Sequence, residues 1–174
     1  YNSAEIAKKI YLEEHPNANI HVIDSLSAGG EVDLLIRKLN HLVAEGLDFD
    51  QVVDGITAYQ SKTKLLFVLA KVDNLVKNGR LTKLVGTVVG LLNIRMVGEA
   101  SKTGTLELLQ KARGQKKAIK AAFDELIKAG YTGGHITIAH RNNDKFIEQF
   151  SELVREKFAQ ASIEVLPTSG LCSF

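Results

Sequence analysis

The stretch that decides the fold lies between residues 77 and 113 and opens with the turn Lys77-Asn78-Gly79-Arg80-Leu81. The apolar segment 84–92 follows, and its glycines, Gly86 and Gly90, leave one side of the predicted helix small. Residues 94–100 and 105–110 then predict two strands. The loop Ser101-Lys102-Thr103-Gly104 joins them, because glycine supplies the backbone freedom that a tight hairpin needs. A helix followed by a β-hairpin indicates a mixed α/β fold.

Upstream of this stretch, apolar spacing predicts three helices and two strands. The first helix is expected to be capped by Asn2 or Ser3 and to end at Pro16, and the second is closed by Gly46. Asp48 with Gln51 three residues later predicts a capping box at the start of the third helix. Residues 20–23 and 65–70 read as short strands because they are rich in β-branched or large apolar residues.

Downstream, a helix is expected from residue 115 until Gly130 stops it. Strands are predicted at residues 135–140 and 162–166, with a helix between them. With the hairpin and residues 65–70, these strands predict one mixed sheet with helices on one face.

Length and composition restrict the class of protein. The 174 residues suit one domain or one and a half, and 45% hydrophobic with 24% charged residues is typical of a globular protein. A net charge of +2 does not favour nucleic-acid binding. The single cysteine excludes an internal disulfide, and no apolar run reaches the length of a membrane helix. We therefore expect a cytoplasmic protein without integral membrane contact.

Motifs for common chemistry are missing from the sequence. It contains no Gly-x-Ser-x-Gly elbow, no His-Glu-x-x-His and no phosphate-binding Gly-Lys-Ser/Thr loop. The five histidines are dispersed, and His135 and His140 lie at opposite ends of one predicted strand, on opposite faces. The sequence therefore predicts neither a catalytic residue nor a metal site nor a cofactor, and the protein is not expected to be an enzyme.

Three sets of residues are candidates for binding, each with a structural alternative. Ser25, Ser27 and Gly29 follow a predicted strand; they either form a turn or, with backbone amides at a helix start, line a ligand mouth. A second set either packs the core or lines an apolar ligand site; its members are Leu84, Val88, Leu91, Ile94 and Met96. The third set either lies in solvent or binds a partner through the paired hydrogen bonds that a guanidinium group donates to a carboxylate or phosphate. It comprises Arg80, Arg95 and Arg113.

The ordered set of motifs resembles the DegV family of bacterial fatty-acid-binding proteins. The matching residues are Tyr1-Asn2-Ser3-Ala4, Ile23-Asp24-Ser25 with Ser27 and Gly29-Gly30, Asn78-Gly79-Arg80-Leu81, Asn93-Ile94-Arg95-Met96, Gly104 and Lys111-Ala112-Arg113. The sequence departs from the family where Arg95-Met96 replaces Lys-Pro. Aligning Pro167 and Gly170 with the family's Gly-Thr-His-Thr-Gly-type string places Cys172 where the family has a histidine near the ligand carboxylate.

The resemblance implies a two-domain organisation. Residues 1–46 would be the remnant of an amino-terminal parallel α/β/α domain, and residues 47–174 a two-layer, mixed-sheet carboxyl-terminal domain. The chain would then be a fragment, because the family's main carboxylate-binding hydroxyls would precede Tyr1. Apolar residues left uncovered by the absent strands would favour self-association.

The resemblance also implies a function. The ligand would be a long-chain fatty acid whose acyl chain reaches into the second domain, and no cofactor is expected. Positions matching Arg80 and Arg113 would dock a fatty-acid kinase, which phosphorylates the bound fatty acid. The alternative is a phosphotransferase substrate domain related to dihydroxyacetone kinase, and a DNA-binding regulator is disfavoured by the charge.

Overall fold

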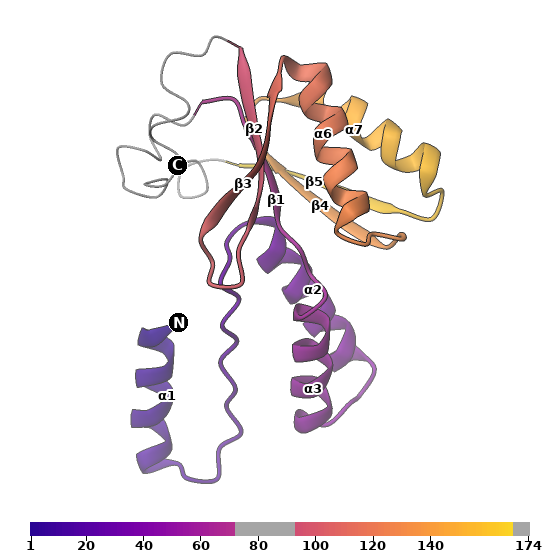
Figure 1. Cartoon of the computed structure of the whole chain (residues 1–174). Helices are drawn as coiled ribbons and strands as arrows, with labels where there is room; N and C mark the ends of the chain where they lie inside the picture. Colours follow the sequence, from indigo (N-terminus) through magenta and orange to yellow (C-terminus); the bar gives the residue numbers. More distant parts are fainter. Residues whose placement is uncertain (72–92, 169–174) are drawn as a thin grey trace.

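The computed structural model of the chain describes residues 1–71 and 93–168. Within these ranges, three helices precede three strands, and helices and strands alternate after them, in a mixed α/β arrangement (Figure 1). The elements are α1 (Asn2–Glu14), α2 (Gly30–Ala44), α3 (Phe49–Gln60), β1 (Leu66–Leu69), β2 (Ile94–Ala100), β3 (Leu106–Arg113), α6 (Gln115–Lys128), β4 (His135–His140), α7 (Asp144–Lys157) and β5 (Ser162–Pro167).

The described strands form two sheets, where the sequence predicted one mixed sheet. β1, β2 and β3 are antiparallel in that order, and β4 and β5 form a separate parallel pair. The segment that contains α7 connects β4 to β5, as a parallel pair requires. The sequence identified the strands but not this division, because apolar patterning sets which face of a strand is buried and says little about which edges pair.

One hydrophobic core serves both sheets. Helices α6 and α7 contribute fully or almost fully buried side chains such as Ala118, Ile119 and Val154, and β2 contributes Val97. Val68 of β1, Ile138 of β4 and Ile163 of β5 pack against the same cluster. Figure 1 shows α6 and α7 together on one side of the strands, so the expectation that helices cover one face holds for this pair.

Strand β2 is the central strand and is buried in its middle on both faces. Met96 is 1% exposed and Val97 is 0% exposed, although successive residues of a strand point to opposite faces. The register with β3 shifts between Val97 and Gly98. A Cβ atom at Gly98 would lie 2.1 Å from the carbonyl oxygen of Glu107 and 2.4 Å from the Phe67 ring. Only glycine therefore fits at this bulge.

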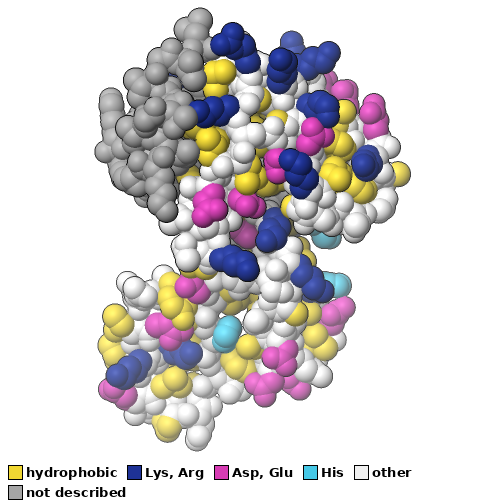
Figure 2. All heavy atoms as spheres, in the orientation of Figure 1, with side chains coloured by type: hydrophobic (Ala, Val, Ile, Leu, Met, Phe, Trp, Pro, Cys, Tyr) yellow, Lys and Arg dark blue, Asp and Glu magenta, His cyan; other side chains and the backbone are white. Residues whose placement is uncertain are grey.

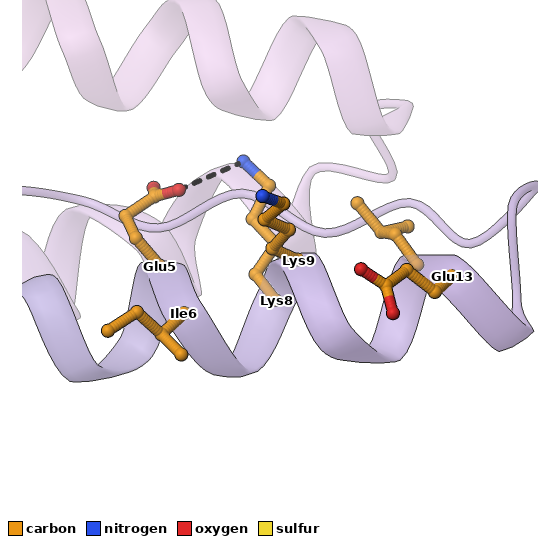
Figure 3. Close-up of a pocket in the computed structure, with 6 residues that line it drawn as sticks. Glu5, Ile6, Lys8, Lys9 and Glu13 are labelled. Carbon is orange, nitrogen blue, oxygen red and sulfur yellow. Dashed lines mark ion pairs between the residues drawn. The ribbon is translucent and has the colours of Figure 1, made fainter.

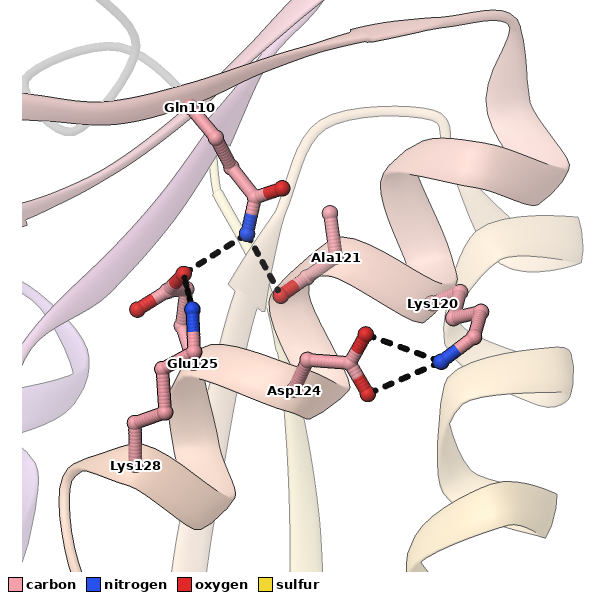
Figure 4. A network of polar contacts seen from close by, with 6 residues as sticks. All are labelled: Gln110, Lys120, Ala121, Asp124, Glu125 and Lys128. Atoms are coloured by element: carbon pink, nitrogen blue, oxygen red, sulfur yellow. Dashed lines mark hydrogen bonds and ion pairs between the residues drawn. The ribbon is translucent and has the colours of Figure 1, made fainter.

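A buried carboxylate fixes α6 against β3. Glu125 is 9% exposed, and its Oε1 accepts hydrogen bonds from Gln110 Nε2 at 2.7 Å and Lys128 Nζ at 2.8 Å. Figure 4 shows this carboxylate between the strand and the helix. The hydrogen bond from Lys128 to Glu125, with the attraction between their charges, raises the pKa of Lys128. The charge of Glu125 is thus paired and hydrogen-bonded, as a buried carboxylate requires.

Helices α2 and α3 form a second, smaller core. Leu35, Leu42 and Ile56 are buried together in a helical hairpin that turns at Gly46, whose φ is +75°. The predicted capping box is confirmed, because Asp48 Oδ1 accepts from Gln51 N and Gln51 Oε1 accepts from Asp48 N. This core spans the expected domain boundary near residue 46 and therefore ties α3 to the preceding helix.

The first 23 residues differ from the prediction in two respects. Helix α1 has Tyr1 at its N-cap and no side-chain capping bond, so neither Asn2 nor Ser3 caps it. Residues 20–23 form no strand, because an isolated extended segment needs a neighbouring strand and none of the described strands pairs with it. Helix α1 buries none of its residues, and Ile6, Ile10 and Tyr11 are exposed, as expected.

No helix within the described ranges has the length and hydrophobicity that crossing a membrane would require.

The central position of β2 predicts a large difference between two valine substitutions. Val97→Ala removes side-chain volume from a 0% exposed site and should lower the free energy of unfolding by about 2 kcal/mol. Val165→Ala is the matched control, since Val165 lies in β5 and is 41% exposed; its cost should be about 0.5 kcal/mol. Urea unfolding measures both. Equal losses would contradict the role of β2 as the centre of the core.

Candidate functional site

The loop of residues 24–29 is the first candidate, and other parts of the chain hold it at both ends. Its first residue is fixed from α3, where Gln60 Nε2 donates to the carbonyl oxygen of Asp24. Within the loop, Leu26 N donates to Asp24 Oδ1 at 3.2 Å, and Leu26 has a φ of +50°. A left-handed conformation costs a residue such as leucine about 1–2 kcal/mol. Such strain persists only where the surroundings enforce it.

The 24–29 loop leads directly into the amino terminus of α2. Gly29 occupies the N-cap with a φ of +71°, and no side chain caps the helix. The next position is also tightly packed, because a Cβ at Gly30 would lie 3.2 Å from the carbonyl oxygen of Thr137 in β4. The first amides of a helix carry partial positive charge and commonly hold anions. The first turn of α2 also carries Glu31 and Asp33, so the loop and the helix start offer a carboxylate backbone amides beside two acidic side chains.

Polar contacts hold α2 against the parallel sheet. Asp33 Oδ2 accepts from Thr137 Oγ1 at 3.3 Å and from Arg37 Nε at 2.8 Å. Arg37 also donates to Glu164 in β5. These contacts, with the close approach of Gly30, fix the position of the helix end beside β4.

Ser27 has an unused hydroxyl in this loop. Its Oγ is buried and has no hydrogen-bond partner among the described residues. The neighbouring Ser25 is different, because its Oγ donates to Ser27 O at 3.2 Å and accepts from Ser27 N at 3.4 Å. Ser25 therefore shapes the loop, whereas the Ser27 hydroxyl has no role in the hydrogen bonds of the described residues. An unsatisfied buried hydroxyl calls for an explanation.

The apolar candidates Ile94 and Met96 lie on the sheet face opposite to α6. Met96 pairs with Leu69 of β1 and Lys111 of β3, whereas the adjacent Val97 belongs to the α6–α7 core. Phe67 and Leu69 share the face of Met96 by the alternation of paired residues. The three-stranded sheet therefore presents apolar side chains on both faces.

Phe67 and Leu69 are site candidates that the sequence interpretation missed. It treated residues 65–70 as one buried apolar run, in which no residue is distinguished from the next. The sequence signal that pointed to them was their spacing, because Phe67 and Leu69 are two residues apart and so lie on the face of a strand opposite to Val68. The assignment of faces required the register with β2, which pairs Val68 with the core residue Val97.

Arg95 and Arg113 lie at the same end of the β2–β3 hairpin but on opposite faces. Arg113 pairs with Ile94, and Arg95 pairs with Ala112, which faces the α6 core. The Arg95 Nε is buried and has no partner in the described part of the chain. Arg113 is exposed and is the last residue of β3, so this strand continues three residues beyond its predicted end.

The chain is basic where β3 ends and α6 begins. Figure 2 shows Lys and Arg side chains gathered at this end of the molecule. We call Arg113, Lys116 and Lys117 the basic end; all three are exposed, and none forms an ion pair within residues 1–71 and 93–168. The first turn of α6 contains no acidic residue, so the positive helix terminus adds to the charge. This surface suits an acidic partner.

Several predicted site residues lie outside the described residues. They are Arg80, Leu84, Val88, Leu91 and Cys172, and their assignments stay predictions.

The described residues contain no cluster of three metal-binding side chains. His140 Nδ1 accepts from Asn143 N at 3.4 Å and lies 3.9 Å from Asp144, so it has local partners at the end of β4.

A hollow of about 600 Å³ beside α1 is lined by residues of that helix alone. Glu5 and Lys8 form an ion pair of 3.8 Å along it (Figure 3). Because no polar groups from a second element converge there, we place no ligand in it.

Comparison with known proteins supports one family. The family model described as "Uncharacterised protein, DegV family" matches residues 1–174. A DegV domain-containing protein of Streptococcus gordonii is 75% identical over 174 residues, which is all of this chain and 62% of that protein. The chain thus spans less than two thirds of the length of this curated relative.

Solved structures agree with this result. The Fatty Acid Kinase (Fak) B3 protein of Streptococcus pneumoniae, loaded with linoleic acid, superposes with a TM-score of 0.93 at 73% identity. The match covers 99% of this chain and 61% of that one. A DegV family protein of Eubacterium eligens, loaded with heptadecanoic acid, gives 0.91 at 37% identity, with 99% and 63% covered. From the full-length family match and these structures, we conclude that the chain belongs to the DegV family.

Proposed function

We propose that this chain is part of a fatty-acid-binding protein of the DegV type. The observation that carries the proposal is the combination of a carboxylate-suited loop and an apolar sheet face in one fold. The Ser27 hydroxyl and the uncapped start of α2 supply polar groups, and the half-buried Phe67 and Leu69, beside the buried Met96, supply apolar side chains on one sheet face. Related proteins with fatty acids bound, at 73% and 37% identity, support the same ligand class.

In this proposal the chain includes a remnant of an amino-terminal domain at residues 1–46, followed by a two-layer domain at residues 47–174. The main carboxylate-binding hydroxyls would lie on residues before Tyr1, as the family resemblance implies. Ser25, Ser27 and Gly29 would line the mouth of the site, and Ile94 and Met96 its apolar wall, together with Leu84, Val88, Leu91 and Cys172. The exposed apolar residues of α1 support this division, because they lack a covering element among the described residues.

The proposal predicts a difference in affinity between the full-length protein and residues 1–174. Native mass spectrometry of the full-length protein should show a co-purified mass of fatty-acid size. Titration with linoleic acid should give the 174-residue chain an affinity lower by about tenfold or more, since a missing charge-assisted hydrogen bond costs about 1.5–3 kcal/mol. Equal, stoichiometric binding by both forms would contradict the fragment assignment, and absence of lipid from both would contradict the ligand.

Substitution of Ser27 separates ligand binding from stability. Ser27→Ala removes a hydroxyl that has no partner in the described structure, so the melting temperature should stay the same or rise slightly. Linoleic acid affinity of the full-length protein should fall by about threefold to tenfold, the value of one hydrogen bond. Ser25→Ala is the control, because it removes bonds within the loop and should lower stability as well. Unchanged affinity in Ser27→Ala would remove Ser27 from the site.

We further propose that the bound fatty acid is presented to a fatty-acid kinase, with Arg80 and Arg113 at the docking surface. Arg95, predicted for the same surface, lies on the opposite face of the hairpin from Arg113 and is left out of this proposal. The exposed charges of the basic end, which have no ion-pair partner among the residues that the structure describes, support this role for Arg113. Arginine forks match carboxylate geometry, so they suit an acidic protein surface. The related structures give no support to the phosphotransferase alternative.

Docking predicts a specific kinetic effect of Arg113→Ala. Because Arg113 is exposed, the substitution should change the free energy of unfolding by only about 0.5 kcal/mol. The carrier concentration that half-saturates the kinase should rise about tenfold or more, with a smaller effect on the rate at saturation. Acyl-phosphate formation by the partner fatty-acid kinase measures both. Arg155→Ala, an exposed change on α7, is the matched control. Normal phosphorylation at low carrier concentration would refute the docking role.

A further inference from the structure

The tip of the β2–β3 hairpin touches the 24–29 loop, although the two are about 75 residues apart in sequence. A Cβ at Gly104 would lie 3.0 Å from the carbonyl oxygen of Leu26 and 3.4 Å from its Cβ. Figure 1 shows the hairpin reaching away from its own sheet toward the amino-terminal segment. Gly104 has a φ of +73°, so glycine serves both the turn and this close approach.

The tip is rigid because hydroxyl groups connect its residues. Ser101 Oγ lies 2.7 Å from Thr105 Oγ1 and 3.0 Å from Thr103 Oγ1, and it accepts from the amides of Thr103 and Thr105. Backbone bonds from Ser101 N to Thr105 O and from Gly104 N to Ser101 O close the turn. A turn with this many internal bonds presents Gly104 to Leu26 in one fixed position.

The left-handed backbone of Leu26 needs stabilising contacts from outside the 24–29 loop. Its side chain is half exposed and its backbone is left-handed, which leucine adopts only when neighbours enforce it. Asp24 holds its amide from one side, and the hairpin tip lies against its carbonyl oxygen on the other. The next residue is Ser27, whose buried hydroxyl has no partner in the described ranges.

We propose that the hairpin tip is a positioning element for the ligand loop, with Gly104 as the positioning residue. By packing against Leu26, the tip keeps the loop in its strained conformation and so holds the Ser27 hydroxyl and the start of α2 where they meet the ligand. This inference rests on the proposed function for its ligand, a fatty-acid carboxylate. It adds a second role for the hairpin, whose opposite end carries Arg113.

Gly104→Ala tests the contact, with Gly130→Ala as the matched control. Both glycines have a strongly positive φ, of +73° and +86°, but a Cβ at Gly130 would meet nothing within 4 Å. Backbone strain is therefore similar in the two variants, and only Gly104→Ala pushes against Leu26. In the ligand-free full-length protein, hydrogen exchange of the Ser27 and Gly30 amides should accelerate about fivefold or more in Gly104→Ala and stay unchanged in Gly130→Ala.

Affinity for linoleic acid gives the second readout. Gly104→Ala should weaken binding about fivefold, and adding Leu26→Gly should reduce this loss, because glycine at 26 takes a positive φ without strain and removes the nearby Cβ. Equal exchange rates in the two single variants would overturn the proposal, and so would faster exchange without weaker binding. If the unmodified full-length protein binds no fatty acid, the proposed function fails, and with it the role of the tip in ligand binding.

Discussion

The need of β2 to bury both of its faces is the constraint on which the rest of the structure depends. Val97 is enclosed by the α6–α7 core, while the adjacent Met96 is almost equally buried on the other face. A strand in this position requires partners on both edges, and β1 and β3 provide them. The glycine at 98 follows from the same crowding, because the Phe67 ring and the Glu107 carbonyl occupy the space of a side chain.

The second face of the three-stranded sheet bears on the proposed binding of an acyl chain. One face is used to fold, through α6, α7 and the buried Glu125 bonded to Gln110. The other carries Phe67, Leu69 and Met96, which belong to neither of the two cores that residues 1–71 and 93–168 form among themselves. Burial of apolar surface is non-directional, so this face is suited to an acyl chain, whereas specificity for the carboxylate has to come from fixed polar groups such as those of the 24–29 loop.

The β2–β3 hairpin connects the 24–29 loop, the two sheet faces and the arginines at its open end. Its tip lies against Leu26, its centre contributes Met96 and Val97, and its open end carries Arg95 and Arg113. Paired strands with a bulge and a bonded tip form a stiff element, in contrast to a surface loop. The proposed ligand and partner surfaces therefore share one rigid unit, which also belongs to the main core.

The sequence by itself determined the family, the identity of most helices and strands, and the capping box at Asp48, because these depend on local spacing and on turn chemistry. It wrongly assigned residues 20–23 to a strand, placed the five strands from residue 65 onward in one sheet and missed Phe67 and Leu69 as site candidates. The tertiary structure decided the pairing of edges, the separation of Arg95 from Arg113 onto opposite faces, and the contact of Gly104 with Leu26. The reason is physical: propensity and periodicity act over a few residues, whereas register and close approach depend on residues that are distant in the chain.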